Sequence, residues 1–180
     1  MKNLIVLVLL CALAGLGSAA THTQKHRKTL AEVTEIQGYS CAKGYAWFYP
    51  DGRLASCTIA QDTEFGVAKA PAGSWITLTA DGKPMFLGLS HNTPILGYTC
   101  LGGSFLGPSE GASTAFYPSG KLKQCWLAGD QEVQGIPCRG SGMFSGDSGV
   151  QFYESGKLHT CEVSKKFGNL QRRQRFTQEP

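Results

Sequence analysis

Apart from one apolar run at its start, the chain shows no stripe of apolar residues at the 3.6-residue period of an amphipathic helix. Its apolar residues fall in short runs separated by Gly, Pro, Asp and Ser, which is typical of strands and turns. The pattern also repeats, because three segments share the string F-Y-x-[DS]-G-[KR]-L-x-x-C, at residues 48–57, 116–125 and 152–161. A fourth copy, residues 76–84, keeps the turn but lacks the Tyr and the Cys.

Each copy predicts a β-hairpin. The strings Pro-Asp-Gly and Pro-Ser-Gly suit a type I turn followed by a left-handed glycine, which together close a bulged three-residue loop. That loop would pair the Phe before the turn with the Leu after it, on one face of the sheet. The expected pairs are Phe48–Leu54, Phe116–Leu122 and Phe152–Leu158. Simple alternation then places Cys57 on the opposite face, with Tyr49 and Arg53.

The spacing of the copies predicts how they assemble. The turn glycines Gly52, Gly82, Gly120 and Gly156 are 30, 38 and 36 residues apart. One hairpin is only marginally stable alone, whereas about four stacked side by side share one sheet. We therefore expect an all-β fold of tandem β-hairpin repeats that form an antiparallel sheet. The repeat is compatible with an elongated sheet and with a rolled barrel.

The ends of the chain differ in composition from the repeats. Residues 1–20 combine Lys2, an apolar run and the small residues before Ala20, which is the pattern of a signal peptide. The run is shorter than the roughly 20 apolar residues of a membrane span, so no transmembrane segment is expected after cleavage. Lipid attachment at Cys11 is disfavoured because Leu10 stands where a small residue is expected. We expect a flexible segment at 21–35, the repeat domain at 36–167, a basic tail at 168–180, and an exported protein, periplasmic or secreted.

Cysteine placement fits an oxidising compartment. Of the seven cysteines, six follow the leader, and an even number in an exported chain favours disulfides. A second short motif, G-[YI]-x-C, precedes each full hairpin copy, so each full unit has one cysteine before its Gly-rich connector and one at its hairpin end. Pairing within units follows the repeat symmetry and gives Cys41–Cys57, Cys100–Cys125 and Cys138–Cys161, although six cysteines allow 15 connectivities.

The Tyr-x-[DS]-Gly-[KR]-Leu signature at 48–54, 116–122 and 152–158 resembles the tandem β-hairpins of MORN repeats, in particular those of bacterial antitoxin-repeat proteins of the YwqK type. The units here are longer than that family's, and the paired cysteines are not part of its usual motif. The resemblance implies an elongated sheet of hairpins and a scaffolding or binding role, with no catalytic residue.

Charge is modest overall, at a formal +4, and gathers at the two ends. Basic ends without an aromatic-rich basic face favour solvated tails over a nucleic-acid partner. A second basic row recurs just after each turn and would line one edge of a stacked sheet. This possible anion-binding edge consists of Arg53, Lys83, Lys121 and Lys157.

The sequence gives little support for a catalytic site or a metal site. Gly146-Asp-Ser-Gly149 matches the nucleophile string of trypsin-like proteases, but the surrounding motifs are absent and Ser148 falls in a Gly-rich connector. None of the histidines has metal-chelating spacing, and no cofactor is expected; these are His22, His26, His91 and His159.

Two functions are therefore weighed. The favoured one is an exported, non-enzymatic β-repeat protein whose disulfide-stapled surface binds a protein or cell-envelope partner. The alternative is a secreted hydrolase with a site in the Gly-rich connectors.

Overall fold

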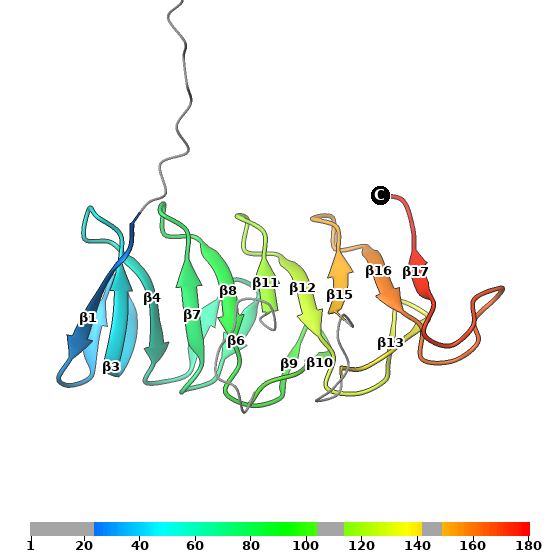
Figure 1. Ribbon diagram of the computed structural model, residues 1–180, viewed down its shortest axis with the longest axis horizontal. Coiled ribbons are helices and arrows are strands. Elements are labelled where there is room, and N and C mark those ends of the chain that lie inside the picture. Colours follow the sequence, from blue (N-terminus) through cyan, green and yellow to red (C-terminus); the bar gives the residue numbers. More distant parts are fainter. Residues whose placement is uncertain (1–23, 104–113, 142–148) are drawn as a thin grey trace, which may run out of the picture.

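The computed structural model describes residues 24–103, 114–141 and 149–180. All the secondary-structure elements in these ranges are β-strands, and the strands pair antiparallel, which confirms the all-β prediction. Hairpins stand side by side in sequence order and form one elongated, open sheet (Figure 1). The predicted signal peptide, Cys11, His22 and Ser148 lie outside the described residues.

Eleven strands make up the large sheet, which begins at β1 and ends at β17. Ten of them follow one another across the sheet. The eleventh, β2, pairs with residues 39–41 of β3, whereas β1 pairs with residues 44–48 of the same strand. In order these are β1 (His26–Leu30), β2 (Thr34–Ile36), β3 (Tyr39–Phe48), β4 (Leu54–Ile59), β7 (Trp75–Leu78), β8 (Pro84–Gly88), β11 (Thr114–Phe116), β12 (Leu122–Trp126), β15 (Gly149–Phe152), β16 (Leu158–Glu162) and β17 (Arg175–Thr177).

Small hairpins form a second layer, which the sequence reasoning missed. They are β5 (Thr63–Phe65) with β6 (Ala68–Ala70), β9 (Thr93–Ile95) with β10 (Tyr98–Cys100), and β13 (Gln131–Val133) with β14 (Ile136–Cys138). In the first unit, β2 and the start of β3 take this place. The Gly of the G-[YI]-x-C motif closes the tight turn: Gln37 and Gly38 have φ of 54° and 82°, as a type I′ turn requires. We call β2–β4, β5–β8, β9–β12 and β13–β16 the first to fourth units.

The four large hairpin turns have the predicted geometry. At the first, the Tyr49 N–H donates to the Arg53 carbonyl (2.8 Å) and the Gly52 N–H donates to the Tyr49 carbonyl (2.9 Å). Gly52 has a φ of 85°, which favours glycine because a side chain is strained there. The other turns repeat both bonds, and the register confirms the predicted pairs Phe48–Leu54, Phe116–Leu122 and Phe152–Leu158.

One expectation about side-chain direction is wrong. Phe48 pairs with Leu54, but Trp47 pairs with Ser56, so Ala55 is an extra residue in a β-bulge. The bulge shifts the alternation by one position. Cys57 therefore shares the buried face with Phe48 and Leu54 and does not lie opposite them.

The hydrophobic core lies between the large sheet and the small hairpins. The central residues Phe65, Ile95 and Val133 of the small hairpins are at most 1% exposed and belong to one cluster with the sheet residues Leu54 and Leu122. Phe65 also packs edge-on against Phe116, at 5.5 Å between ring centroids. We call the sheet face that contacts this layer the inner face.

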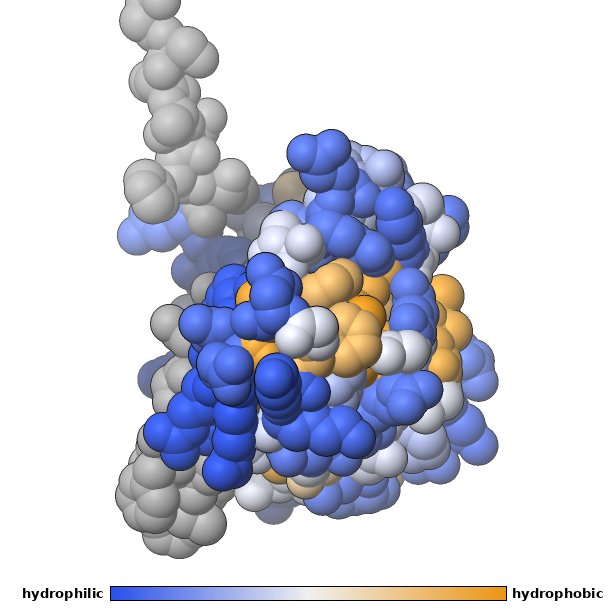
Figure 2. All heavy atoms as spheres, turned by 90° about the vertical axis from the view of Figure 1, so that its right-hand side faces the viewer, coloured by the Kyte–Doolittle hydropathy of each residue, from blue (hydrophilic) through white to orange (hydrophobic). Residues whose placement is uncertain are grey.

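The sheet extends past the expected domain limits at both ends. Residues 26–30, expected within a flexible segment, form β1 and pair with β3. In the basic tail, Arg175–Thr177 forms β17 and pairs with β16. Figure 2 looks onto this C-terminal end and shows a small apolar area surrounded by hydrophilic side chains. Phe167 and Phe176 are half-buried in this region, with ring centroids 6.2 Å apart.

Candidate functional site

The four turn cations stand along one long edge of the sheet, where the large hairpin turns line up (Figure 1). Two of them are already paired within their own turns. Arg53 contacts Asp51 at 2.7 Å and Lys83 contacts Asp81 at 3.0 Å. These contacts partly neutralise the first half of the proposed anion-binding edge.

The second half of this edge differs because serine replaces the turn aspartate. Lys121 follows Ser119 and is exposed, and the Lys157 ammonium donates to the Glu179 carbonyl at 2.9 Å. In the described residues, Lys121 and Lys157 therefore lack the ion pair with a turn aspartate that Arg53 and Lys83 have.

Hydrogen bonds within the turns perturb both aspartates. The Thr79 hydroxyl donates to Asp81 (2.5 Å) and, together with Lys83, lowers the pKa of Asp81 to about 2. A hydrogen bond from the Arg53 side chain lowers the pKa of Asp51. Both carboxylates are thus held ionised as internal partners of the turn cations.

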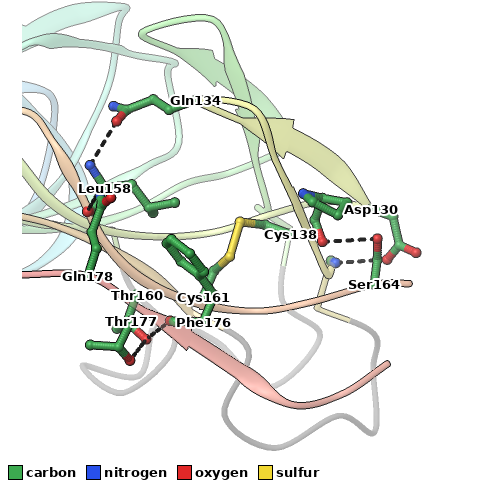
Figure 3. The surroundings of a disulfide bond; sticks show 12 residues. Asp130, Gln134, Cys138, Leu158, Thr160, Cys161, Ser164, Phe176, Thr177 and Gln178 are labelled. Atoms are coloured by element: carbon green, nitrogen blue, oxygen red, sulfur yellow. Dashed lines mark hydrogen bonds between the residues drawn. A yellow bond between two sulfur atoms is a disulfide. The ribbon is translucent and has the colours of Figure 1, made fainter. Parts of the chain in front are cut away.

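All three predicted disulfides are present: Cys41–Cys57, Cys100–Cys125 and Cys138–Cys161. Each one joins the second strand of a small hairpin to the outgoing strand of the large hairpin. Figure 3 shows the last of them, with Phe176 of β17 beside it; Phe176 is also the sheet partner of Cys161. The disulfides therefore hold the two layers together.

The second unit has no cysteine at the corresponding positions. Ala70 occupies the place of Cys41, and Leu87 occupies the place of Cys57. Both residues are 0% exposed, so packing replaces the covalent link there.

Two of the three described histidines pack on aromatic rings. His26 stacks on Phe48 at 5.7 Å between ring centroids, and His159 packs on Tyr153 at 4.4 Å. His91 contacts the neighbouring Ser90 hydroxyl at 3.1 Å. No group of three His, Cys, Asp or Glu residues suited to a metal ion occurs in the described ranges.

The opposite side of the large sheet, which we call the outer face, carries the side chains that alternate with the core residues. The strand register connects them into one continuous row across ten strands, with one residue from each strand. The row runs through Arg27, Trp47, Ser56, Thr77, Phe86, Ala115, Gln124, Gln151, Thr160 and Thr177.

Every tryptophan of the chain lies on this outer face. Trp47 alternates with the core residues Ala46 and Phe48, and Trp75 and Trp126 lie next to Ile76 and Cys125. All three indoles are half-buried. Tryptophan combines a large apolar surface with one N–H donor, and this combination is enriched at binding surfaces.

Small polar residues lie between the aromatic ones in the first half of the face. Ser56 and Thr77 pair with each other and point outward, but they are only 5% and 3% exposed. The Trp75 indole N–H donates to the Thr77 hydroxyl at 3.2 Å, which fixes that indole. Trp75 and Trp126 also lie directly opposite glycines, Gly88 and Gly149 respectively.

The repeated tyrosines connect each hairpin that contains one to the segment that follows it in the sheet. The hydroxyl of Tyr49 donates to the Leu78 carbonyl (2.8 Å), that of Tyr117 to the Phe152 carbonyl (2.8 Å), and that of Tyr153 to the Gln178 carbonyl (2.7 Å). The Tyr of the repeat motif therefore fixes each hairpin to the strand that follows it.

Sequence reasoning missed the outer face because the bulge was not foreseen. Ser56 and Gln124 become outward-facing only because the bulge before each of them resets the alternation of the returning strand. A usable signal was nonetheless present. In all three hairpins the Cys stands three positions after the Leu, and residues three positions apart point to opposite faces of a regular strand. Two apolar residues at this spacing can share the buried face only if the strand contains a bulge.

Within the described residues, no helix is long and apolar enough to cross a membrane. The chain matches no family model, no curated protein and no solved structure.

Proposed function

We propose that this protein is an exported, non-enzymatic binding module that engages its partner through the outer face of the large sheet. The observation that carries the proposal is the position of all three tryptophans on that face, opposite the core. Tryptophan is enriched among the residues that supply most of the energy at binding surfaces.

The architecture supports a role as a rigid platform. The two layers share one core and are linked by three disulfides, so the outer face is held in place by groups buried beneath it. A surface fixed before binding loses little conformational entropy when a partner docks. An extended, prealigned surface of this kind suits an elongated partner.

Export is the second part of the proposal. Disulfides persist in oxidising compartments, and residues 1–20 have the pattern of a secretory leader. A periplasmic or secreted location follows, with a protein or cell-envelope component as partner. The resemblance to MORN repeats implies a binding role as well.

Site-directed photo-crosslinking in the cells that make the protein tests the proposal. A photoreactive phenylalanine analogue at Trp47 or Phe86 probes the outer face, and the same analogue at Glu64 or Glu132, which are exposed on the small hairpins, is the matched control. We expect adducts from the outer face alone. Equal adducts from both layers, or none from either, would overturn the proposal.

The hydrolase alternative has its own test. A panel of ester and peptide substrates should show no turnover by the purified protein. Turnover that disappears in Ser148→Ala would favour the alternative over a binding role.

A further inference from the structure

We propose that the outer face binds a linear, uncharged polysaccharide that lies across the strands. This inference rests on the proposed binding function and names the chemical class of the partner. Three features of the face support it: the spacing of its rows, the types of its accessible side chains and the distribution of its charges.

The spacing comes from the sheet itself. Neighbouring strands lie about 4.8 Å apart, which is close to the length of one sugar unit in an extended polysaccharide. A chain laid along the outward row would therefore present about one sugar to each strand. Measured across the strands, Trp75 on β7 is about 10 Å from Trp47 on β3, and Trp126 on β12 is about 14 Å beyond Trp75. Trp75 and Trp126 belong to the neighbouring outward row, because each is two residues along its strand from Thr77 or Gln124, which share the row of Trp47.

The accessible side chains suit a sugar polymer. The apolar C–H face of a sugar ring packs on a flat aromatic ring, and Trp47, Trp75 and Phe86 supply such surfaces in the first half of the face. Half-buried Gln124 and Gln151 follow in the second half and offer amide donors and acceptors for hydroxyl groups. The first half of the face thus offers aromatic surface to the C–H faces of sugars, and the second half offers amides to their hydroxyl groups.

Charge favours an uncharged polymer. From β4 to β11, the described side chains on the outer face are all neutral. They are Ala55, Ser56, Thr58, Trp75, Thr77, Met85, Phe86 and Ala115. The nearest cations at the turn edge, Arg53 and Lys83, are paired with Asp51 and Asp81. From β4 to β11 a polyanion would therefore find little complementary charge, although the exposed cations Arg27 and Lys123 flank this stretch on β1 and β12.

An extended peptide fits the same surface less well. Its residues rise about 3.3 Å each, so its side chains fall out of step with strands about 4.8 Å apart. Within the large sheet, the strands from β3 to β16 are also paired on both sides, which leaves no backbone edge on the face for strand addition.

Intrinsic fluorescence provides a direct assay because every tryptophan lies on the proposed surface. The full mature protein is titrated with cellohexaose and chitohexaose, with the matching disaccharides, and with polygalacturonate as an anionic polymer. We expect a fluorescence change with a neutral hexasaccharide, an affinity that rises with chain length, and little dependence on salt.

Point variants test the outer face separately from the rest of the molecule. Trp75→Ala should weaken hexasaccharide binding at least about ten-fold, while Glu132→Gln on the small hairpins should bind as the wild type does. Phe86→Ala serves as a second variant if Trp75→Ala loses its sheet circular dichroism. Equal binding by the outer-face variants and the control would overturn the proposal.

Other outcomes identify which proposal fails. Binding only to polygalacturonate, lost when Arg53, Lys83, Lys121 and Lys157 are all replaced by Ser, would replace this inference with the anion-binding edge. Failure of all sugars together with crosslinks from the outer face to a protein would refute the polysaccharide and keep the binding function. Failure of both experiments would refute both proposals.

Discussion

The second and fourth units occupy equivalent places in the sheet but are stabilised by different interactions. The fourth has the Cys138–Cys161 disulfide and the tyrosine bond from Tyr153 to the next strand. The second has Ala70 and Leu87 at the cysteine positions and Thr79 at the tyrosine position. The same backbone is therefore compatible with a covalent link or with close packing.

Interactions with the next unit compensate in part for what the second unit lacks. Val67 N–H donates to the Gly120 carbonyl of the third unit at 3.0 Å. Gly66 lies so close that an added Cβ would be 2.5 Å from that same oxygen. The absence of a side chain at Gly66 thus allows a close backbone contact between the second unit's small hairpin and the third unit. In the fourth unit, the side chain of Gln134 on the small hairpin instead bonds to the backbone of its own large hairpin.

Reduction of all three disulfides should have the largest effect. Each closes a loop of 16, 25 or 23 residues, and each contributes about 3 kcal/mol in the chain-entropy model. Together they approach the whole stability of a typical domain. We expect the reduced protein to lose its sheet circular dichroism, including in the second unit, because one hairpin is marginal alone. An unchanged urea midpoint after verified reduction would contradict this.

The next effect concerns the packed replacement for the disulfide. Leu87→Ala removes a fully buried side chain and should lower the free energy of unfolding by about 2–5 kcal/mol. Met85→Ala in the same strand is half-buried and is the matched control, with a smaller loss expected. Urea denaturation under oxidising conditions measures both. Equal losses would show that Leu87 has no special place in the core.

The converse change would make the two units alike. Ala70→Cys combined with Leu87→Cys should form a fourth disulfide, because these positions match Cys41 and Cys57 in the sheet register. Thiol titration and the mass of the intact oxidised protein report the bond. Two reactive thiols in the folded protein would show that the second unit's layers are spaced differently.

The tyrosine bonds between units should contribute less. Tyr117→Phe removes the donor to the Phe152 carbonyl (2.8 Å) and should cost about 1 kcal/mol. Tyr45→Phe, at a residue 54% exposed, is the control and should change stability little. Equal urea midpoints for the two variants would refute a role for the repeated tyrosine between units.

The smallest effect is a pH dependence in the second unit's turn. The pKa of Asp81 is lowered to about 2, first by the hydrogen bond from Thr79. A lowered carboxyl pKa stabilises the fold above the ordinary value of 3.8, and that contribution is lost as the pH falls from about 4 to 2. Thr79→Val should move the NMR titration midpoint of Asp81 upward, whereas Thr77→Val, away from the turn, should leave it in place.

The hairpins and disulfides were predictable because their causes are local. The turn strings around Gly52 and Gly120 set the loop geometry, and the geometry set the pairing of Phe48 with Leu54. Repeat symmetry was sufficient to pair the cysteines correctly. The small hairpins were missed, although Gln37-Gly38 and Gln134-Gly135 between alternating residues are signals for tight turns.

The sequence by itself determined the all-β class, the four turns, the register at each turn and the cysteine pairs. Only the tertiary structure decided which side chains face the core and which face outward. The reason is that strand alternation has a period of two, so one extra residue such as Ala55 reverses the assignment of everything beyond it. Cys57 thereby became buried, and the tryptophans were gathered on one open face by strands that are distant in sequence.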